Sequence, residues 1–400
     1  MGGIKIERVY ESENKDFAKE IRIFEQEFLT PLKPISLTRY SRIPEVVKEE
    51  IKRIDIFKHT IGEVYVSTNL KDIELSMNTE ENKLTRIDNA LVTARELGIK
   101  HKIAIFGIDN PQMSEDIIDY LITIQIANFD ILIPPTFHED ILLEKGTPIL
   151  KGYKETLHTF IQKALERNEY TKTPKPIFGV IPVDAPFGVI KDLLTIYLKE
   201  EYREEMSGFY FDFRNKDLAS KRYLERISTN LVKIFDELNK LANSGKLSLP
   251  PEEKYLFYGG RIGRSPANPA KWVSYLDFID IVGNIAKDKI GGGRSTGRIT
   301  IPDFNMYQVH SVPLSEVPKK LSDFPFDEDL YNKLGDNSKR KLIYAYVDYK
   351  DFKEGITLHR KTKENNEVQY LESKQPLRTV VKEIVKIKNE VLGGGLSKMF

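Results

Sequence analysis

Short apolar segments that alternate with helix-like stretches constrain the fold of this chain more than any other feature of its sequence. Each segment is brief, almost continuously apolar and flanked by Gly, Pro or Asp, which is the pattern of strands buried on both faces. Such strands belong in a parallel sheet that helices cover. The expected strands are residues 64–67, 102–108, 130–133, 176–181, 208–211, 254–258 and 278–282.

Amphipathic helices are expected between these strands. Residues 153–167 and 223–242 each place their large apolar side chains on one stripe at helical spacing, and Gly245 is expected to end the second helix. No early Gly-x-Gly-x-x-Gly turn marks a dinucleotide crevice. Because strand and helix alternate over about 250 residues, the usual size of a (β/α)8 barrel, the sequence predicts an α/β protein with a TIM barrel.

The pattern changes after about residue 300, where four prolines fall within a polar stretch. We interpret this change as a domain boundary. Residues 1–310 are expected to form the barrel domain, and residues 311–400 a small α+β appendage. A basic helix is expected at residues 377–390, near the end of the appendage.

Composition excludes several classes of protein. The chain has 400 residues, of which 40% are hydrophobic and 30% charged, and it lacks both a run of about 18 apolar residues and a signal-peptide core, so a soluble, cytoplasmic protein is expected. The absence of cysteine excludes disulfides, thiolate catalysis and Cys-containing zinc sites. The six histidines show no metal-ligand spacing, so neither a metal nor a cofactor is expected. With 61 basic and 60 acidic side chains, any binding of nucleic acid needs a local basic patch.

Asp280 is the strongest candidate for a functional residue. It lies in the segment 275–283, which is rich in aromatic and β-branched residues, and an acid is costly to bury there. The alternative is a structural one, in which Asp280 forms a buried ion pair. The candidate partners for that pair are Lys287, Lys289, Arg294 and Arg298.

Other candidates follow from the rule that barrel enzymes carry their chemistry where strands end. This rule brings Asp109, Thr136, Pro182, Asp212, Gly259, Gly260 and Asp280 to one mouth. Asp109 is as well explained by a turn or helix cap before Pro111 as by acid catalysis. Asp212 is expected to pair with Arg214 or Arg222, and the two glycines form either a tight turn or a surface for a flat ligand.

The order of segments between residues 111 and 315 resembles the tRNA-guanine transglycosylase superfamily, whose members exchange guanine in nucleic acid for a 7-deazaguanine on a TIM barrel. Phe278-Ile-Asp-Ile-Val282 is similar to the family's Met-Phe-Asp-Cys-Val, which carries the nucleophile, and Arg294-Ser-Thr-Gly-Arg298 is similar to the loop after it. Further similar segments are Met113-Ser-Glu-Asp-Ile-Ile, Phe129-Asp-Ile-Leu-Ile133, Ile177-Phe-Gly-Val-Ile181, Gly208-Phe-Tyr-Phe211 and Tyr255-Leu-Phe-Tyr-Gly-Gly260.

The chain also departs from the family pattern. The motif with the family's second aspartate has no clean counterpart, and Asp109 is the nearest substitute. Thr136 and Pro182 stand where the family has the Asp and Gln that recognise the edge of the base, and the cysteines of the zinc insert are missing after Tyr307. A zinc-less, shortened member of this kind looks more like the branch that acts on DNA, or a dedicated paralogue, than like a housekeeping tRNA enzyme.

The resemblance implies a covalent mechanism. Asp280 would trap the sugar as in retaining glycosidases, and Asp109, with Asp212 as second choice, would protonate the departing base. The flipped nucleotide would be held by Gly208, Phe209, Tyr210, Gly259 and Gly260. The expected phosphate-binding residues, which could equally be solvated loop charges, are Arg261, Arg264, Lys287, Lys289, Arg294 and Arg298.

The expected partners are tRNA or DNA and a deazaguanine base, together with a second copy or a related barrel in a dimer. A different class of function remains open. The chain could be a catalytically inactive barrel that binds nucleic acid or serves as a partner subunit. Retention of Asp280 favours the enzyme, whereas Thr136 and Pro182 favour the inactive barrel.

Overall fold

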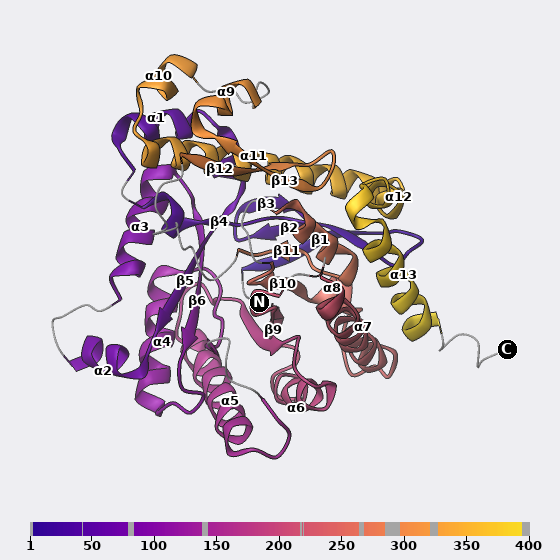
Figure 1. Ribbon diagram of the computed structural model, residues 1–400. Coiled ribbons are helices and arrows are strands. Elements are labelled where there is room, and N and C mark those ends of the chain that lie inside the picture. The colour runs from indigo at the N-terminus through magenta and orange to yellow at the C-terminus, as the bar shows by residue number, and fades with distance from the viewer. Residues whose placement is uncertain are drawn as a thin grey trace.

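Two parallel four-stranded sheets form the centre of the protein in the computed structural model (Figure 1). The structure describes residues 3–41, 43–78, 84–137, 143–216, 218, 220–263, 268–284, 297–320 and 327–393. The first sheet contains, in order, β4 (Ile35–Ser36), β5 (Ile61–Thr68), β6 (His101–Ile108) and β7 (Thr136–Phe137). The second contains β11 (Ile281–Val282), β10 (Leu256–Gly260), β9 (Met206–Asp212) and β8 (Ile177–Pro182). The expected α/β class with parallel strands is confirmed.

Single-residue parallel bridges connect the two sheets. Leu32, just before β4, pairs with Ile281 of β11, and Leu132, just before β7, pairs with Ile177 of β8. Pairing within each sheet is parallel throughout. All eight strands therefore run in one direction, and their carboxyl ends lie at the same edge.

Helices follow most of the strands. The expected helices at 153–167 and 223–242 are confirmed as α5 (Pro148–Glu169), capped by the Thr147 side chain, and α7 (Lys221–Asn243). Gly245 follows α7 with φ of 69°, a conformation that glycine adopts without strain. The other α-helices are α1 (Glu45–Lys52), α2 (Leu70–Asn78), α3 (Thr85–Leu97), α4 (Glu115–Asn128), α6 (Phe187–Tyr197), α8 (Pro251–Lys254), α9 (Val317–Lys320), α10 (Glu328–Lys333), α11 (Asp336–Lys363), α12 (Glu367–Glu372) and α13 (Arg378–Gly393). The 3-10 helices are η1 (Leu37–Tyr40), η2 (Asp55–His59), η3 (Pro269–Asp277), η4 (Leu314–Glu316) and η5 (Gln375–Leu377). None of the helices within the described ranges is long and apolar enough to cross a membrane.

The strands face two separate apolar cores. Alternate residues point to opposite faces of a strand, so Tyr258 of β10 lies in an inner core while Phe257 lies in an outer one beneath the helices. The inner core takes residues from both sheets. Its strand residues are Ile61, Ile103, Ile105, Phe178, Val180, Tyr210, Leu256, Tyr258 and Ile281.

An antiparallel N-terminal sheet, which the sequence analysis did not predict, covers the amino ends of the parallel strands. It consists of β1 (Ile4–Glu11), β2 (Phe17–Ile23) and β3 (Gln26–Leu29). Its residues Ile21, Ile23 and Phe28 complete the inner core. The inner core is therefore closed at this end by side chains of the N-terminal sheet.

The C-terminal residues belong to the same body as the sheets. The expected boundary between residues 310 and 311 falls inside β13 (Gln308–Pro313), which pairs antiparallel with β12 (Arg298–Asp303). The expected basic helix is present as α13, and its Val381 and Ile384 are buried in the outer core. Residues 311–400 therefore do not form an appendage separated at that position.

Candidate functional site

Asp280 lies in a buried ion pair with a residue of the N-terminal sheet. Its Oδ2 is 2.7 Å from Lys19 Nζ and accepts a hydrogen bond of 2.8 Å from the Phe257 amide. The side chains of Lys19 and Asp280 are only 1% and 2% exposed. Lys19 also donates to the Tyr255 carbonyl at 3.0 Å. Burial raises the pKa of Asp280, and the ammonium of Lys19 opposes that rise.

This position corrects the expectation that Asp280 projects into a mouth at the carboxyl ends. Asp280 comes before β11 and pairs through its backbone with Phe257, near the start of β10. The next residue, Ile281, lies in the inner core, so the Asp280 side chain points to the opposite face. The alternative of a buried ion pair is confirmed, but its partner is Lys19 rather than a cation that follows the strand.

Asp109 serves as a helix cap. Its Oδ1 accepts a hydrogen bond of 3.2 Å from the amide of Leu70, the first residue of α2, in an exposed position. An acid placed here satisfies an amide at the helix start. The capping alternative is thus the observed one, although the helix is not the one that follows Asp109 in sequence.

The expected base-binding residues are packing residues. A Cβ on Gly208 would lie 2.1 Å from the Leu256 carbonyl oxygen, and one on Gly259 would lie 2.7 Å from Ile262. Phe209 stacks within the outer core, 6.3 Å from Phe211 between ring centroids. These residues hold strands and helices together instead of facing a ligand.

Tyr210 and Gly260 fit against each other in the same way. A Cβ on Gly260 would lie 1.9 Å from the Tyr210 hydroxyl oxygen, so the glycine leaves room for the ring. Tyr210 lies in the inner core with its ring centroid 5.1 Å from that of Tyr258. A flat ligand is not needed to explain the glycines at 259 and 260.

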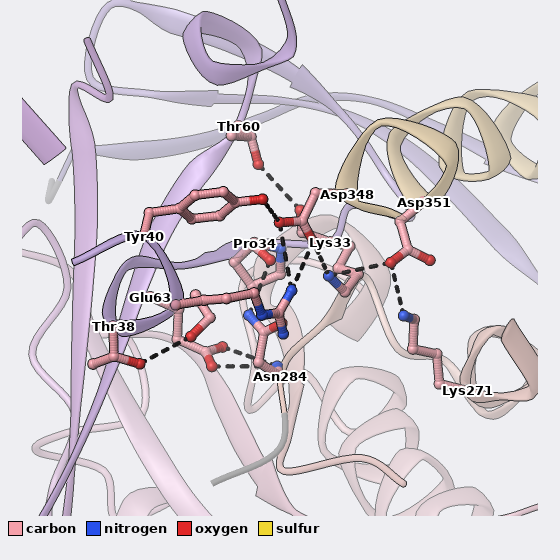
Figure 2. Close-up of polar contacts among 12 residues, drawn as sticks. Lys33, Pro34, Thr38, Tyr40, Thr60, Glu63, Lys271, Asn284, Asp348 and Asp351 are labelled. Atoms are coloured by element: carbon pink, nitrogen blue, oxygen red, sulfur yellow. Dashed lines mark hydrogen bonds and ion pairs between the residues drawn. The ribbon is translucent and has the colours of Figure 1, made fainter. Parts of the chain in front are cut away.

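A set of polar side chains gathers near the carboxyl ends of β9, β10 and β11 and is joined by Glu63, the third of the eight residues of β5. We call it the carboxyl-end cluster: Glu63, Asp212, Tyr258, Arg261 and Asn284. Glu63 of β5 is 4% exposed and accepts a hydrogen bond from the Tyr258 hydroxyl. It also accepts from the Asn284 amide at 3.2 Å, as Figure 2 shows. Burial, followed by the charge of Glu63, raises the pKa of Tyr258 well above its usual value, so this hydroxyl keeps its proton and donates it.

Asp212 and Arg261 form the second half of the carboxyl-end cluster. The Arg261 Nε is 2.7 Å from Asp212 Oδ1, its Nη2 binds Oδ2, and Nη2 also donates to the Phe137 carbonyl at 3.0 Å. Burial lowers the pKa of Arg261 but the charge of Asp212 outweighs it, so the pKa is raised. Arg261 is only 2% exposed, which contradicts its expected role as a surface phosphate ligand. Asp212 receives only a backbone amide bond from its expected partner Arg214, at 3.0 Å.

Asp184, two residues beyond β8, is the carboxylate next to this pair. Its Oδ1 is 3.3 Å from Arg214 Nη1, and its side chain is 14% exposed. Burial is the largest effect on Asp184 and raises its pKa; Arg214 lowers it, and the charge of Asp212 raises it further. A partly exposed carboxyl with a raised pKa can hold a proton and release it.

Arg298 is the one expected phosphate ligand that lies at a described groove. The groove has a volume of about 570 Å³ and lies along β12 and β13. Arg264, Lys287, Lys289 and Arg294 fall outside the described residues. The lining residues of the groove include Arg298, Phe304, His310, Lys320, Tyr346 and Lys350.

Thr136 and Pro182, the two departures from the family pattern, have structural roles. The Thr136 hydroxyl donates to the Phe106 carbonyl at 3.3 Å, and Pro182 ends β8 beside Asp212 of β9. Both residues are buried. They join neighbouring strands at the level of the carboxyl-end cluster.

A second buried polar cluster fastens α11 to the start of β4 (Figure 2). Lys33 Nζ is 2.8 Å from Asp348 Oδ1 and 3.2 Å from Asp351 Oδ2, and Lys271 Nζ is 2.8 Å from the same Asp351 oxygen. The Tyr40 hydroxyl donates to Asp348 at 2.5 Å. The side-chain amide of Asn284 donates a hydrogen bond of 3.0 Å to the carbonyl of Pro34, the residue after Lys33. The two clusters therefore meet at β4.

Glu63 is the residue that the sequence analysis missed. The signal was present, because Glu63 is an acid inside the apolar run 61–66, the same pattern that singled out Asp280. Only the register of each acid in its sheet shows which of the two side chains faces the inner core. Glu63 pairs across the sheet with Ile103, an inner-core residue, whereas Asp280 points away from that core.

Comparison with known proteins assigns no family. No protein-family model and no curated protein matches the chain. A trimodular endoglucanase of the GH5_4 subfamily is 10% identical, with a TM-score of 0.38, over 67% of this chain and 57% of the endoglucanase. The beta-glycosidase BGL167 is 10% identical, with a TM-score of 0.31, over 80% of this chain and 96% of the other. The chain thus spans little more than half of the endoglucanase, and TM-scores this low carry no conclusion on fold or activity.

Proposed function

We propose that the two parallel sheets are the halves of one (β/α)8 barrel. The support is that bridges connect β11 to the β4 segment and the β7 segment to β8, one at each junction of the sheets. The inner core takes residues from both sheets, and the outer core lies beneath the helices. Both features are also typical of a barrel. In such a fold the carboxyl-end cluster occupies the usual position of an active site.

We further propose that the protein is a glycosyl-transfer enzyme that exchanges a base in nucleic acid, with Glu63 as the reacting carboxylate in place of Asp280. The observation that carries this proposal is the position of Glu63. Its two oxygens face the inner side of the sheet and receive hydrogen bonds from the Tyr258 hydroxyl and from the backbone amide of Asn284, which follows β11. Donors of this kind hold a carboxylate ionised and oriented for attack.

The chemistry needs a second group that moves a proton. Glu63 would attack the sugar C1′, and the electrons of the N-glycosidic bond would pass to the departing base, which takes a proton from Asp184. The incoming 7-deazaguanine would return a proton to Asp184 as its ring nitrogen displaces Glu63 from C1′. Burial raises the pKa of Asp184, which is the direction that a proton donor requires.

The polynucleotide would follow the groove along β12 and β13. Arg298, Lys320 and Lys350 supply positive charge, and the rings of Phe304 and Tyr346 line the same space. Basic and aromatic side chains together are typical of surfaces for single-stranded nucleic acid. Asp303 Oδ2 of this groove lies 3.4 Å from His310 Nε2.

The test is exchange of labelled guanine or 7-deazaguanine into tRNA and DNA in parallel, with trapping of the covalent sugar adduct after denaturation. Glu63→Gln should abolish both the exchange and the adduct, whereas Asp280→Asn, in a fraction shown to be folded, should retain them. Loss of the adduct in folded Asp280→Asn with retention in Glu63→Gln would restore Asp280 as the nucleophile and refute this proposal.

A second candidate function is a barrel without catalysis that binds nucleic acid. The buried pair of Asp280 with Lys19 favours it, because the residue that resembles the family nucleophile is engaged elsewhere. This candidate predicts binding of tRNA or DNA that Arg298→Ala weakens, with no exchange and no adduct. Adduct formation by the native protein would eliminate it.

A further inference from the structure

Four ionisable side chains are buried together where α13 meets the main body, and we call them the latch cluster: Asp16, Asp277, Glu367 and Lys388. They come from the β1–β2 turn, the end of η3, the start of α12 and the last turns of α13. Asp16, Asp277 and Glu367 are 0% exposed and Lys388 is 3% exposed. The carboxyl-end cluster and the proposed reaction do not involve any of them.

Lys388 makes the contact that crosses from α13 to the main body. Its Nζ is 2.6 Å from Asp16 Oδ1 and donates to the Lys15 carbonyl at 3.1 Å. It also lies 4.6 Å from the centroid of the Phe278 ring. The ammonium is therefore held by groups from the β1–β2 turn and from the residue after η3.

In each of the three carboxyl groups, one oxygen has a hydrogen-bond partner among the described residues and the other has none. Asp277 accepts from the Ser228 hydroxyl of α7 at 2.8 Å, and Glu367 accepts from the Asn14 amide group at 3.3 Å. Among the described residues, no hydrogen-bond partner is found for Asp16 Oδ2, Asp277 Oδ1 or Glu367 Oε2. A buried, ionised oxygen without a donor is strongly disfavoured, whereas a protonated one is not.

One ammonium therefore faces three carboxyl groups. Burial raises the pKa of Asp16 to about 7 against the opposing charge of Lys388, and burial also raises that of Asp277 to about 7. Uncharged polar groups of the described residues also face this space. They are Ser228 of α7, Asn14 of the turn, and Tyr275 of η3, whose hydroxyl contacts Thr362 of α11 at 2.6 Å.

We propose that the latch cluster is a proton-controlled latch that fastens α13 to the main body. It is closed when Asp16 and Asp277 keep protons beside the ammonium of Lys388, and it is weakened when these two residues lose them. The proposal is independent of the reaction assigned to the carboxyl-end cluster.

The direction of the pH dependence follows from proton linkage. The docked state binds protons up to about pH 7, whereas exposed Asp residues lose theirs near their usual pKa of about 4. Undocking of α13 should therefore become easier as pH rises between these two values, by up to about tenfold per pH unit for each proton released. Above the raised pKa the undocking equilibrium should level off.

The absence of cysteine makes a direct measurement possible. We suggest a cysteine at Ile387, which is 5% exposed beside Lys388, or at Ile384, which is 0% exposed one turn earlier. Its reaction with 4,4′-dithiodipyridine is followed from pH 4.5 to 8.5. A cysteine at Lys386, whose side chain is 61% exposed on the same helix, corrects for thiol ionisation.

The corrected reaction rate should rise at least tenfold between pH 4.5 and 7 and then level off. Asp277→Asn, which imitates the protonated acid, should keep the rate low at pH 7.5. Asp236→Asn, at a partly exposed position of α7 that pairs with Lys240 at 2.7 Å, should behave like the native protein. A rate that stays constant with pH in both cysteine positions, or that Asp277→Asn leaves unchanged, would overturn the latch.

Discussion

Removing the carboxylate of Asp280 should destabilise the fold before it affects any chemistry. The substitution Asp280→Asn leaves the ammonium of Lys19 at 1% exposure without a counter-ion, and the Tyr255 carbonyl at 3.0 Å still accepts from it. Breaking one partner of a buried ion pair typically costs about 3–5 kcal/mol. We expect a loss of about 3 kcal/mol in the free energy of unfolding, at the lower end of that range, because the Asn oxygen can still accept from the Phe257 amide.

A double-mutant cycle separates the interaction energy of the Lys19–Asp280 pair from the effect of changing each residue alone. Lys19→Met leaves Asp280 charged and buried with the Phe257 amide as donor, so it should cost a similar amount. The double variant Lys19→Met with Asp280→Asn buries no net charge and should recover about 2 kcal/mol relative to the sum of the single changes.

Urea unfolding provides the measurement. Trp272 is the only tryptophan and is fully buried, so its fluorescence reports the native core, and far-ultraviolet circular dichroism reports the helices. If Asp280→Asn unfolds within about 0.5 kcal/mol of the native protein, the range of ordinary surface substitutions, or if the two single effects simply add, the reasoning about the buried pair is wrong.

Three further substitutions test the packing and the carboxyl-end cluster. Gly260→Ala would place a methyl group 1.9 Å from the Tyr210 hydroxyl oxygen. It should lower the free energy of unfolding by about 1–3 kcal/mol, measured by thermal or urea unfolding. The control Gly188→Ala, whose added methyl group would have its nearest neighbour at 4.0 Å, should not destabilise the protein. Arg261→Lys loses the two-point contact with Asp212 and should lower stability by about 1–3 kcal/mol; an unchanged midpoint would mean that a single contact suffices. Asp184→Asn should reduce base exchange by about 10²–10⁴-fold while binding of the polynucleotide is retained, and equal loss of both would assign Asp184 to binding.

Several parallel strands and the helices α5 and α7 were predictable because their signal is local, whereas the longest helix, α11, was not predicted and the expected strand at 130–133 makes only isolated bridges. The strands β5, β6 and β9 each contain the expected apolar run, β8 contains all of it but residue 176, and α7 shows the expected stripe. The expected strand at 278–282 is reduced to the two residues of β11, since Phe278 adopts a left-handed conformation with φ of 68°. That conformation depends on the end of η3, which the strand pattern does not reveal.

The N-terminal sheet and the site were harder because they depend on contacts between distant residues. The alternation of Phe17, Lys19, Ile21 and Ile23 in β2 indicates a strand, but its position beneath the parallel strands is set by tertiary packing. Lys19 is 261 residues away from Asp280, so sequence proximity favoured the wrong cations. Glu63 and Asp280 share one local pattern, and only their register in the sheets separates them.

The contact of Lys33 with Asp348 has a consequence for how the chain is made. The two residues are 315 positions apart, and the first parallel strand follows Lys33 directly. On the ribosome, Asp348 and Asp351 are added only after residue 347 of the 400, so Lys33 is made long before its counter-ions. All eight parallel strands are therefore synthesised before the carboxylates that neutralise Lys33, and this buried ion pair can form only after α11 has been made.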